Sequence, residues 1–372
     1  MKKYFVMAAL AVSTLTASAQ SVVPKWINNV KLSGFGIVQY TYNGQENNES
    51  NSFNLRLARL ALDGRAFDDW YWKAQIQFNG NTSTLGSSPK LVDLFIEWQK
   101  YDFLRVKAGQ FKNPFTYENP MHPIDQGFMS YSQVISKFAG FSDRAGAHSS
   151  NGRDIGVQLQ GDFLKNANGR NLIHYQVGVF NGQGINVKDV DQQKNIIGGA
   201  WVMPVEGMRL GAFGWIGSYA RKGTSASEGI TNTTLRRLQQ RRYAFSAEYK
   251  VDDWTFRSEY VHSTGYAFAK AMVNTNDASA KDITLSSNGD KSQGVYALVI
   301  APIIKKKCHA KARYDMYQPS KGAEKQRTQY EIGLDYYFNK NICLTGEYAY
   351  IHDRALADPN YSMIDVELSY RF

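Results

Sequence analysis

The stretch SMIDVELSYRF, residues 362–372, decides how the rest of the chain is interpreted. From Ile364 onward, apolar or aromatic residues alternate strictly with polar residues. This alternation predicts a β-strand with one apolar and one polar face. The final residue, Phe372, falls on the apolar face, so we expect something other than the following chain to cover that face.

The other end of the chain begins MKKYFVMAALAVSTLTASAQ, with Lys2 and Lys3 before an apolar stretch that closes on small residues. This pattern indicates a secretory signal peptide rather than an N-terminal helix of the fold. We therefore predict a signal peptide over residues 1–19 and one domain over residues 20–372, because no linker or shift in composition divides the remainder. Removal of the two lysines lowers the formal net charge from +10 to +8.

Period-two alternation recurs along the whole mature chain, as in WYWKAQIQFNG (70–80), DIGVQLQGDF (154–163) and YEIGLDYYF (330–338). Two classes of connection alternate between these segments. The seven short ones are expected at 67–70, 101–103, 165–170, 204–207, 251–254, 302–305 and 338–341. The eight long ones are expected at 43–51, about 80–90, 113–152, 181–194, 218–240, 265–290, 318–327 and 352–361.

Fifteen connections imply sixteen strands, and short turns at one end with long loops at the other are typical of a bacterial outer-membrane barrel. Soluble β-sandwiches also alternate, but these polar faces run the full length of the strands. Aromatic residues also gather at the strand ends, as expected at a membrane interface. We therefore predict an all-β fold: a transmembrane antiparallel β-barrel of sixteen strands in the outer membrane of a Gram-negative cell. Lipid would cover the apolar face of residues 364–372, and KLSGFGIVQYTYN (31–43) would pair with its edge.

The polar face of such a barrel lines its lumen, and KKKCHAKARYDMY (305–317) places several cations on one face. A ladder of Lys305, Lys307, Lys311 and Arg313 is expected to attract anions into a pore. The alternative is that the first lysines lie in a turn. Lys73, Arg105, Lys107, Arg257 and Arg371 should also face inward. Because acidic residues such as Asp93, Glu97 and Glu331 share that face, the predicted lumen is mixed in charge.

The third long connection, 113–152, exceeds what a plain loop needs and is rich in aromatic residues. Loops of this length are usually functional, and we predict that it folds into the barrel as an inward third extracellular loop. The phase of the strands places Cys343 inward and Cys308 outward, two strands apart, which predicts two free thiols.

A second basic cluster lies in LRRLQQRRY (235–243), where it is either a solvated loop or a surface for lipopolysaccharide phosphates. Nucleic acid is excluded as a partner because this surface faces the cell exterior. No cofactor or metal site is expected. The six histidines are scattered, and no G-x-S-x-G or H-E-x-x-H motif is present, so we predict that the protein is not an enzyme.

Several segments together resemble the phosphate-selective porin O and P family in its Bacteroidetes-type branch. They are KLSGFGIVQYTYN, FNLRLARLALDGRAFDDWYWKAQIQF, LVDLFIEW, LRVKAGQFKNPFTYEN and the closing VELSYRF. The resemblance implies a homotrimeric sixteen-stranded porin, inserted by the barrel insertion machinery, that passes phosphate or other anions by diffusion. It also implies a binding region at Arg56, Arg59, Asp93 and Lys112. The dense lysine cluster of phosphate-specific members is missing from 113–152, so general anion passage is the safer expectation. The alternatives are a structural, adhesin or partner-docking barrel without an open pore and, less favoured, an outer-membrane hydrolase.

Overall fold

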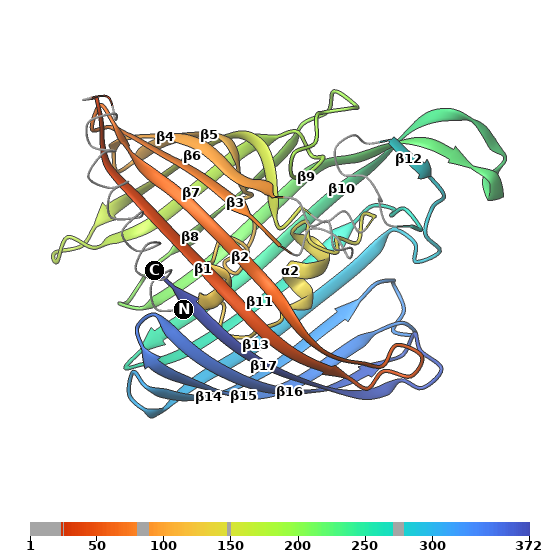
Figure 1. The fold of residues 1–372 in the computed structure, drawn as a ribbon. Coiled ribbons are helices and arrows are strands. Elements are labelled where there is room, and N and C mark those ends of the chain that lie inside the picture. Colours follow the sequence, from red (N-terminus) through yellow and green to blue (C-terminus); the bar gives the residue numbers. More distant parts are fainter. Residues whose placement is uncertain (1–23, 25, 80–88, 147–149, 271–278) are drawn as a thin grey trace, which may run out of the picture.

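The computed structural model describes residues 24, 26–79, 89–146, 150–270 and 279–372, and it forms a closed antiparallel barrel of sixteen strands (Figure 1). A seventeenth, short strand, β12 (Ser279–Asp282), is not one of the sixteen that close the barrel, and it pairs in parallel with β9. The barrel strands are β1 (Ile27–Asn43), β2 (Ser50–Ala66), β3 (Trp70–Gln77), β4 (Lys90–Tyr101), β5 (Leu104–Lys112), β6 (Arg153–Lys165), β7 (Asn171–Phe180), β8 (Asn195–Val202), β9 (Met208–Ser225), β10 (Ile230–Val251), β11 (Trp254–Thr264), β13 (Lys291–Ile304), β14 (Cys308–Gln318), β15 (Arg327–Asn339), β16 (Ile342–Asp353) and β17 (Asn360–Arg371).

The barrel closes by pairing of the first strand with the last. β1 and β17 are antiparallel from Phe35 opposite Arg371 to Asn43 opposite Met363. The backbone of Phe372 exchanges two hydrogen bonds with Gly34, of 3.0 and 3.1 Å. Closure satisfies backbone groups that an open edge would leave unpaired in lipid. The predicted partner of the C-terminal strand is therefore confirmed.

The alternation at the C-terminus divides outside from inside as predicted. Leu368 and Tyr370 on the outer face are 42% and 46% exposed. Glu367 and Ser369, which alternate with them, are buried on the lumen side. An apolar exterior of this kind suits lipid rather than water. None of the helices in the described part of the chain combines the length and apolarity that a membrane-spanning helix needs.

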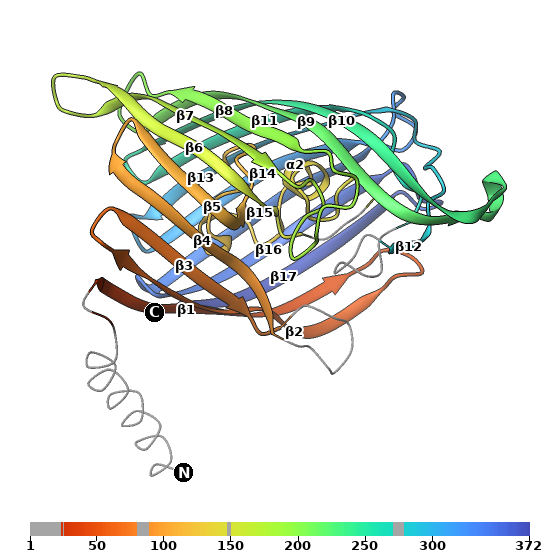
Figure 2. The same cartoon turned by 90° about the horizontal axis from the view of Figure 1, so that it is seen from above.

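The seven short and eight long connections occur in the predicted order, with two corrections. The short connection predicted at 302–305 lies at 305–307, because β13 continues to Ile304 and β14 begins at Cys308. We predicted a long loop at 218–240, but β9 continues to Ser225 and β10 begins at Ile230, with a short 3₁₀ helix, η2 (Ala226–Glu228), between them. The two strands remain paired far along this hairpin, as at Leu235 opposite Lys222, and it projects beyond the other strands (Figure 2). The tip carries threonines and asparagine on both faces, so it lacks the alternation by which strands are recognised.

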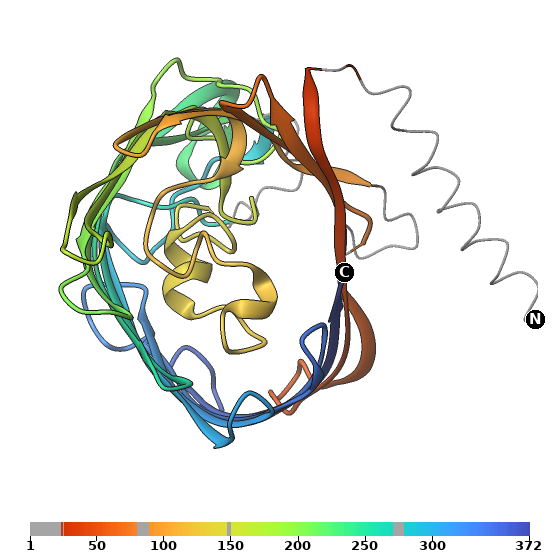
Figure 3. The same ribbon diagram turned by 90° about the vertical axis from the view of Figure 1, so that its left-hand side faces the viewer.

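The third long connection lies inside the barrel, and we call residues 113–152 the inward segment (Figure 3). It contains the 3₁₀ helix η1 (Pro123–Asp125) and the short helix α2 (Gln133–Phe138). Its apolar residues, such as Phe115 and Phe138, pack with wall residues such as Trp215 and Tyr296 in one buried cluster. The lumen is therefore not uniformly polar, because part of it is a packed apolar core between the inward segment and the wall.

The two cysteines are free, as predicted. Cys343 on β16 is buried on the lumen side, whereas Cys308 on β14 is half-buried and two strands away. The predicted signal peptide, residues 1–19, lies outside the described residues. The same holds for residues 80–88, 147–149 and 271–278, which belong to the second, third and sixth long connections.

Candidate functional site

Charged side chains of the barrel wall hold the backbone of the inward segment. The Glu259 carboxylate accepts hydrogen bonds from the backbone N–H groups of Tyr117 and Glu118, at 2.7 and 2.9 Å. The Asp315 carboxylate accepts one from the N–H of Gln133 at 2.7 Å. Buried backbone groups need hydrogen-bond partners, and a loop inside a barrel cannot find them in a sheet. The wall acids therefore have a structural role at these positions.

Lys311, a member of the predicted cationic ladder, belongs to the same support. Its ammonium lies 2.7 Å from Asp335 and 2.6 Å from Glu347, and it donates to the carbonyl of Gly127 at 2.8 Å. Glu347 in turn accepts from the backbone N–H of Met129 at 3.0 Å. Two carboxylates thus face one ammonium, so Lys311 does not contribute net positive charge to the lumen.

Arg313 is neutralised in the same way. Its guanidinium makes two hydrogen bonds to Glu331, of 2.6 and 2.9 Å, and donates to the carbonyl of Ser130 at 3.0 Å. Such bidentate pairs are strong and directional. Lys311 and Arg313 therefore fix the inward segment to β14–β16 and leave no cationic surface there.

Lys305 and Lys307 do not lie on the lumen face, which corrects the predicted ladder. β13 ends at Ile304 and β14 begins at Cys308, so both lysines belong to the turn between these strands. The side chain of Lys305 is 69% exposed, and Lys307 extends over the outer ring of Tyr336 at 5.6 Å. The sequence left open that these two lysines lie in a turn, and that alternative is the correct one.

Arg56 and Arg105 face the lumen but are paired. The guanidinium of Arg56 lies 2.7 Å from Glu367 and also donates to the carbonyl of Met129 in the inward segment. Arg105 forms an ion pair with Asp162. Neither position offers an uncompensated charge.

The other predicted site residues, Arg59, Asp93, Lys107 and Lys112, lie together around one cavity of about 250 Å³. The cavity lies between strands β1–β5 and the start of the inward segment. We call it the basic cavity because five cations line it: Arg59, Lys73, Lys107, Lys112 and Arg153. Asp93 is the only acid among its lining residues in the described part of the chain.

Asp93 does not face the basic cavity as a free acid. Its two oxygens accept from Nε and Nη2 of Arg153, at 2.6 and 3.0 Å. Arg153 is the first residue of β6 and lies opposite Lys112, the last residue of β5, in the strand register. A cation therefore stands at each end of the inward segment, where the chain leaves the wall and where it returns. From the sequence, Lys73 was expected on the lumen face but was not assigned to the site, and Arg153 was given no role. Both residues could have been assigned to the site from the sequence, because they lie on strands close to that of Asp93.

Three of the five cations lack an acidic partner among the described residues. Lys112 donates to the carbonyl of Met121 at 2.6 Å, and Nε of Arg59 donates to the Gln77 side chain at 2.8 Å, but neither forms an ion pair. Lys73 has no ion pair either within the described ranges. Lys107 does have one, because Glu97 lies 3.6 Å from its ammonium. The basic cavity therefore has a net positive charge.

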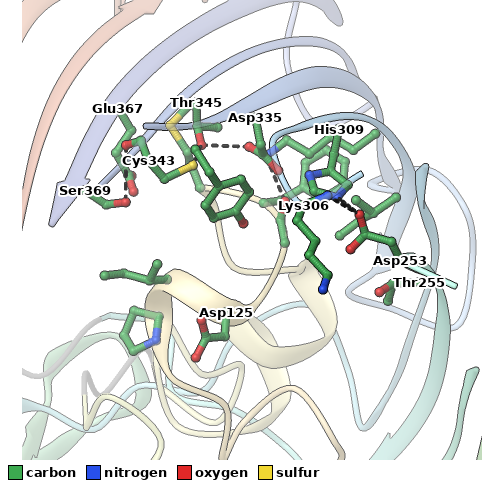
Figure 4. Close-up of a pocket in the computed structure, with 18 of the residues that line it drawn as sticks. Asp125, Asp253, Thr255, Lys306, His309, Asp335, Cys343, Thr345, Glu367 and Ser369 are labelled. Atoms are coloured by element: carbon green, nitrogen blue, oxygen red, sulfur yellow. Dashed lines mark hydrogen bonds and ion pairs between the residues drawn. The ribbon is translucent and has the colours of Figure 1, made fainter. Parts of the chain in front are cut away.

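A second cavity, of about 560 Å³, lies on the other side of η1, toward the short turns (Figure 4). Several of its charged groups are paired: His309 contacts Asp253 at 2.9 Å, and Lys311 lies 2.7 Å from Asp335. Burial raises the pKa of Asp253, but the hydrogen bonds from the Lys306 backbone and His309 outweigh it and leave that pKa below its ordinary value. This second cavity is therefore polar but close to neutral, in contrast to the basic cavity.

Comparison with known proteins gives one family match and many similar folds. The family described as phosphate-selective porin O and P matches residues 33–193. No curated protein matches the chain. The anion-selective porin from Comamonas acidovorans superposes with a TM-score of 0.62 at 13% identity, over 92% of this chain and 99% of that chain.

Two further structures share the barrel. A loop-deletion mutant of OmpT, an outer-membrane protein of Vibrio cholerae, has a TM-score of 0.62 at 12% identity, over 92% of this chain and 99% of that chain. The channel DcaP of Acinetobacter baumannii has a TM-score of 0.60 at 13% identity, over 92% and 97%. At these identities the structures establish only the fold. With the family match they confirm the resemblance inferred from the sequence: residues 33–193 match the family described as phosphate-selective porin O and P, and the whole chain has the barrel fold of an outer-membrane porin.

Proposed function

We propose that this porin lets small solutes diffuse passively and favours anions, with a pathway that passes the basic cavity between the inward segment and β1–β5. The observation that carries the proposal is the set of three lumen cations, Arg59, Lys73 and Lys112, without ion-pair partners among the described residues. Charges inside a low-dielectric wall act over longer distances than charges on an open surface and raise the local concentration of counterions. Rings of lysine and arginine are a usual lining of anion pores.

The proposal moves the selective charge away from the ladder expected on β14. Lys311 and Arg313 face carboxylates and hold the inward segment, so their role is to position it. By doing so they keep that segment against one side of the lumen. The unpaired charges then lie on the opposite side, where β1–β5 and the inward segment enclose the basic cavity.

Phosphate is a natural candidate solute because the matching family is described by that selectivity. Since Asp93 is engaged by Arg153, we assign Asp93 the role of orienting that arginine rather than receiving a solute proton. We also propose a homotrimer in contact with outer-membrane lipid and lipopolysaccharide, delivered by a signal peptide over residues 1–19 and assembled by the barrel insertion machinery. A channel without enzymatic activity fits both the family and the similar structures.

A barrel without an open pore is the second candidate, and one observation favours it. The apolar core between the inward segment and the wall fills part of the lumen. If the remaining side is also closed, the protein would be a structural, adhesin or partner-docking barrel. Ion conductance by purified protein in a planar bilayer separates the two functions.

The experiment compares the zero-current potential of three proteins in a potassium chloride gradient. Wild type should show anion preference, and the double variant Lys73→Gln/Lys112→Gln should lose much of it. The matched control is Lys305→Gln/Lys307→Gln, which removes two lysines from an exposed turn and should leave the potential unchanged. Equal potentials for the two double variants would overturn the assignment to the basic cavity.

A further inference from the structure

The basic cavity has an apolar side that the charge argument does not use. Pro120, Met121 and Pro123 of the inward segment line it, facing the cationic strands. Phe95 and the rings of Phe35 and Phe111 also line it from the wall. One side of the basic cavity is thus charged, and the other side offers hydrocarbon and aromatic surface.

The ring of Phe95 lies in the lumen because the neighbouring strand leaves room for it. Phe95 pairs with Gly109 across β4 and β5, and a Cβ atom at Gly109 would overlap the carbonyl of Leu94 and Cα of Phe95. The φ angle of Gly109, +131°, is also one that side chains rarely tolerate. The absence of a side chain at Gly109 therefore allows Phe95 to lie against the wall beside Phe111, with ring centres 5.9 Å apart.

The cations of the basic cavity are placed beside these rings. The Lys107 ammonium lies 5.0 Å from the centre of the Phe95 ring and 5.3 Å from that of Phe111. The Arg59 guanidinium lies 5.7 Å from the Phe35 ring. Only Nε of Arg59 has a hydrogen-bond partner among the described residues, so its two terminal amino groups can donate to both oxygens of a carboxylate in a bidentate pair.

We propose that the basic cavity binds organic anions that carry a flat apolar group, of which aromatic carboxylates are the simplest, in preference to small hydrated anions. This inference rests on the proposed anion pathway and specifies its substrate class. A small hydrated anion can contact the cations, but it leaves the surface of Phe95, Met121 and the prolines in water. An aromatic carboxylate places its charge at Arg59 and Lys112 and its ring against that surface, so both sides of the basic cavity are used.

The test measures how strongly sodium benzoate and sodium acetate inhibit the chloride current of single channels. Both ions carry one carboxylate, so they differ in the apolar group alone. We expect half-inhibition by benzoate at a concentration roughly tenfold lower than by acetate, which is a usual discrimination for a small apolar group in a pocket. Equal half-inhibition by the two ions in wild type would overturn the inference.

Variants then locate the effect. Phe95→Leu and, from the opposite side, Met121→Gln should each reduce the advantage of benzoate over acetate severalfold. The matched control is Phe103→Leu, because Phe103 lies in the turn between β4 and β5 and is 57% exposed. Retention of the full advantage in both cavity variants would overturn the site. Cation preference of the wild-type channel would instead overturn the proposed function itself, so the two failures are distinguishable.

Discussion

Replacement of Asp93 by asparagine separates two roles for this acid. If Asp93 only neutralises and orients Arg153, Asp93→Asn leaves the guanidinium uncompensated and adds one positive charge to the basic cavity. If Asp93 instead contacts the solute, as the family resemblance implies, the same change should impair anion passage. The structure favours the first role, because both oxygens of Asp93 already accept from Arg153.

The size of the effect follows from Coulomb's law. An ion that passes ~7 Å from the released charge changes in energy by ~0.6 kcal/mol if the dielectric constant is that of water. Anion and cation shift in opposite directions, so their permeability ratio changes by ~1.2 kcal/mol, and screening at about 0.1 M salt reduces this to roughly threefold. Anion preference should therefore rise by roughly threefold.

The assay is the zero-current potential in a potassium chloride gradient. Asp102→Asn is the matched control, because Asp102 lies in the turn between β4 and β5 and pairs with Lys165, both of them exposed. The control should match wild type. A lower anion-to-cation permeability ratio in Asp93→Asn, in protein that is folded as the wild type is, would refute the reasoning.

Three further predictions concern the inward segment and the cysteines. Arg242 forms a buried ion pair with Asp143 at 2.7 Å, so Arg242→Met should lower the free energy of unfolding in detergent by ~3–5 kcal/mol. The control Arg354→Met, at an exposed position, should leave that free energy unchanged. Equal unfolding midpoints for the two variants would contradict the role of Arg242. Burial lowers the pKa of His122 from 6.5 to about 4, so between these pH values the native protein binds fewer protons at His122 than the unfolded protein does. The free energy of unfolding should therefore fall by up to ~3 kcal/mol as pH drops from 6.5 to 4. Unfolding of His122→Gln should depend less on pH, and a pH dependence identical to that of wild type would contradict the role of His122. Titration of denatured, unreduced protein should find two thiols per chain, and fewer would mean that a disulfide forms.

The barrel itself could be predicted because alternation is a local property. Each strand must present apolar residues to lipid and polar residues to the lumen, so residues 364–372 alone reveal both faces. The ladder on β14 was wrong at its first two members because the turn occupies residues 305–307, where Lys306 has a φ of +60°. The extended β9–β10 hairpin was missed because lipid does not impose alternation beyond the membrane.

The charge balance of the lumen could not be read from one strand. Lys311 faces acids from β15 and β16, and Asp93 pairs with Arg153 from β6, sixty positions further along the chain. These pairs depend on barrel register and on the path of the inward segment. Strand phase placed Lys73 and Lys107 on the lumen face correctly, and the family resemblance pointed to Arg59 and Lys112. Only the structure distinguishes these residues from cations that are already neutralised.

The inward segment explains why so many charges lie inside the barrel. Its backbone carbonyls and N–H groups are buried away from any strand, and each needs a partner. Wall acids such as Glu259 and Asp315 accept from its N–H groups, while Lys311 and Arg313 donate to its carbonyls. Most lumen charge is thus used for support, and we propose that the few cations without partners decide the selectivity.

The most direct test of that claim is the zero-current potential of wild-type channels across a tenfold potassium chloride gradient in a planar bilayer. The account predicts discrete conductance steps and a potential with the sign of chloride preference. A potential with the sign of potassium preference, or folded protein that gives no conductance at all, would contradict it.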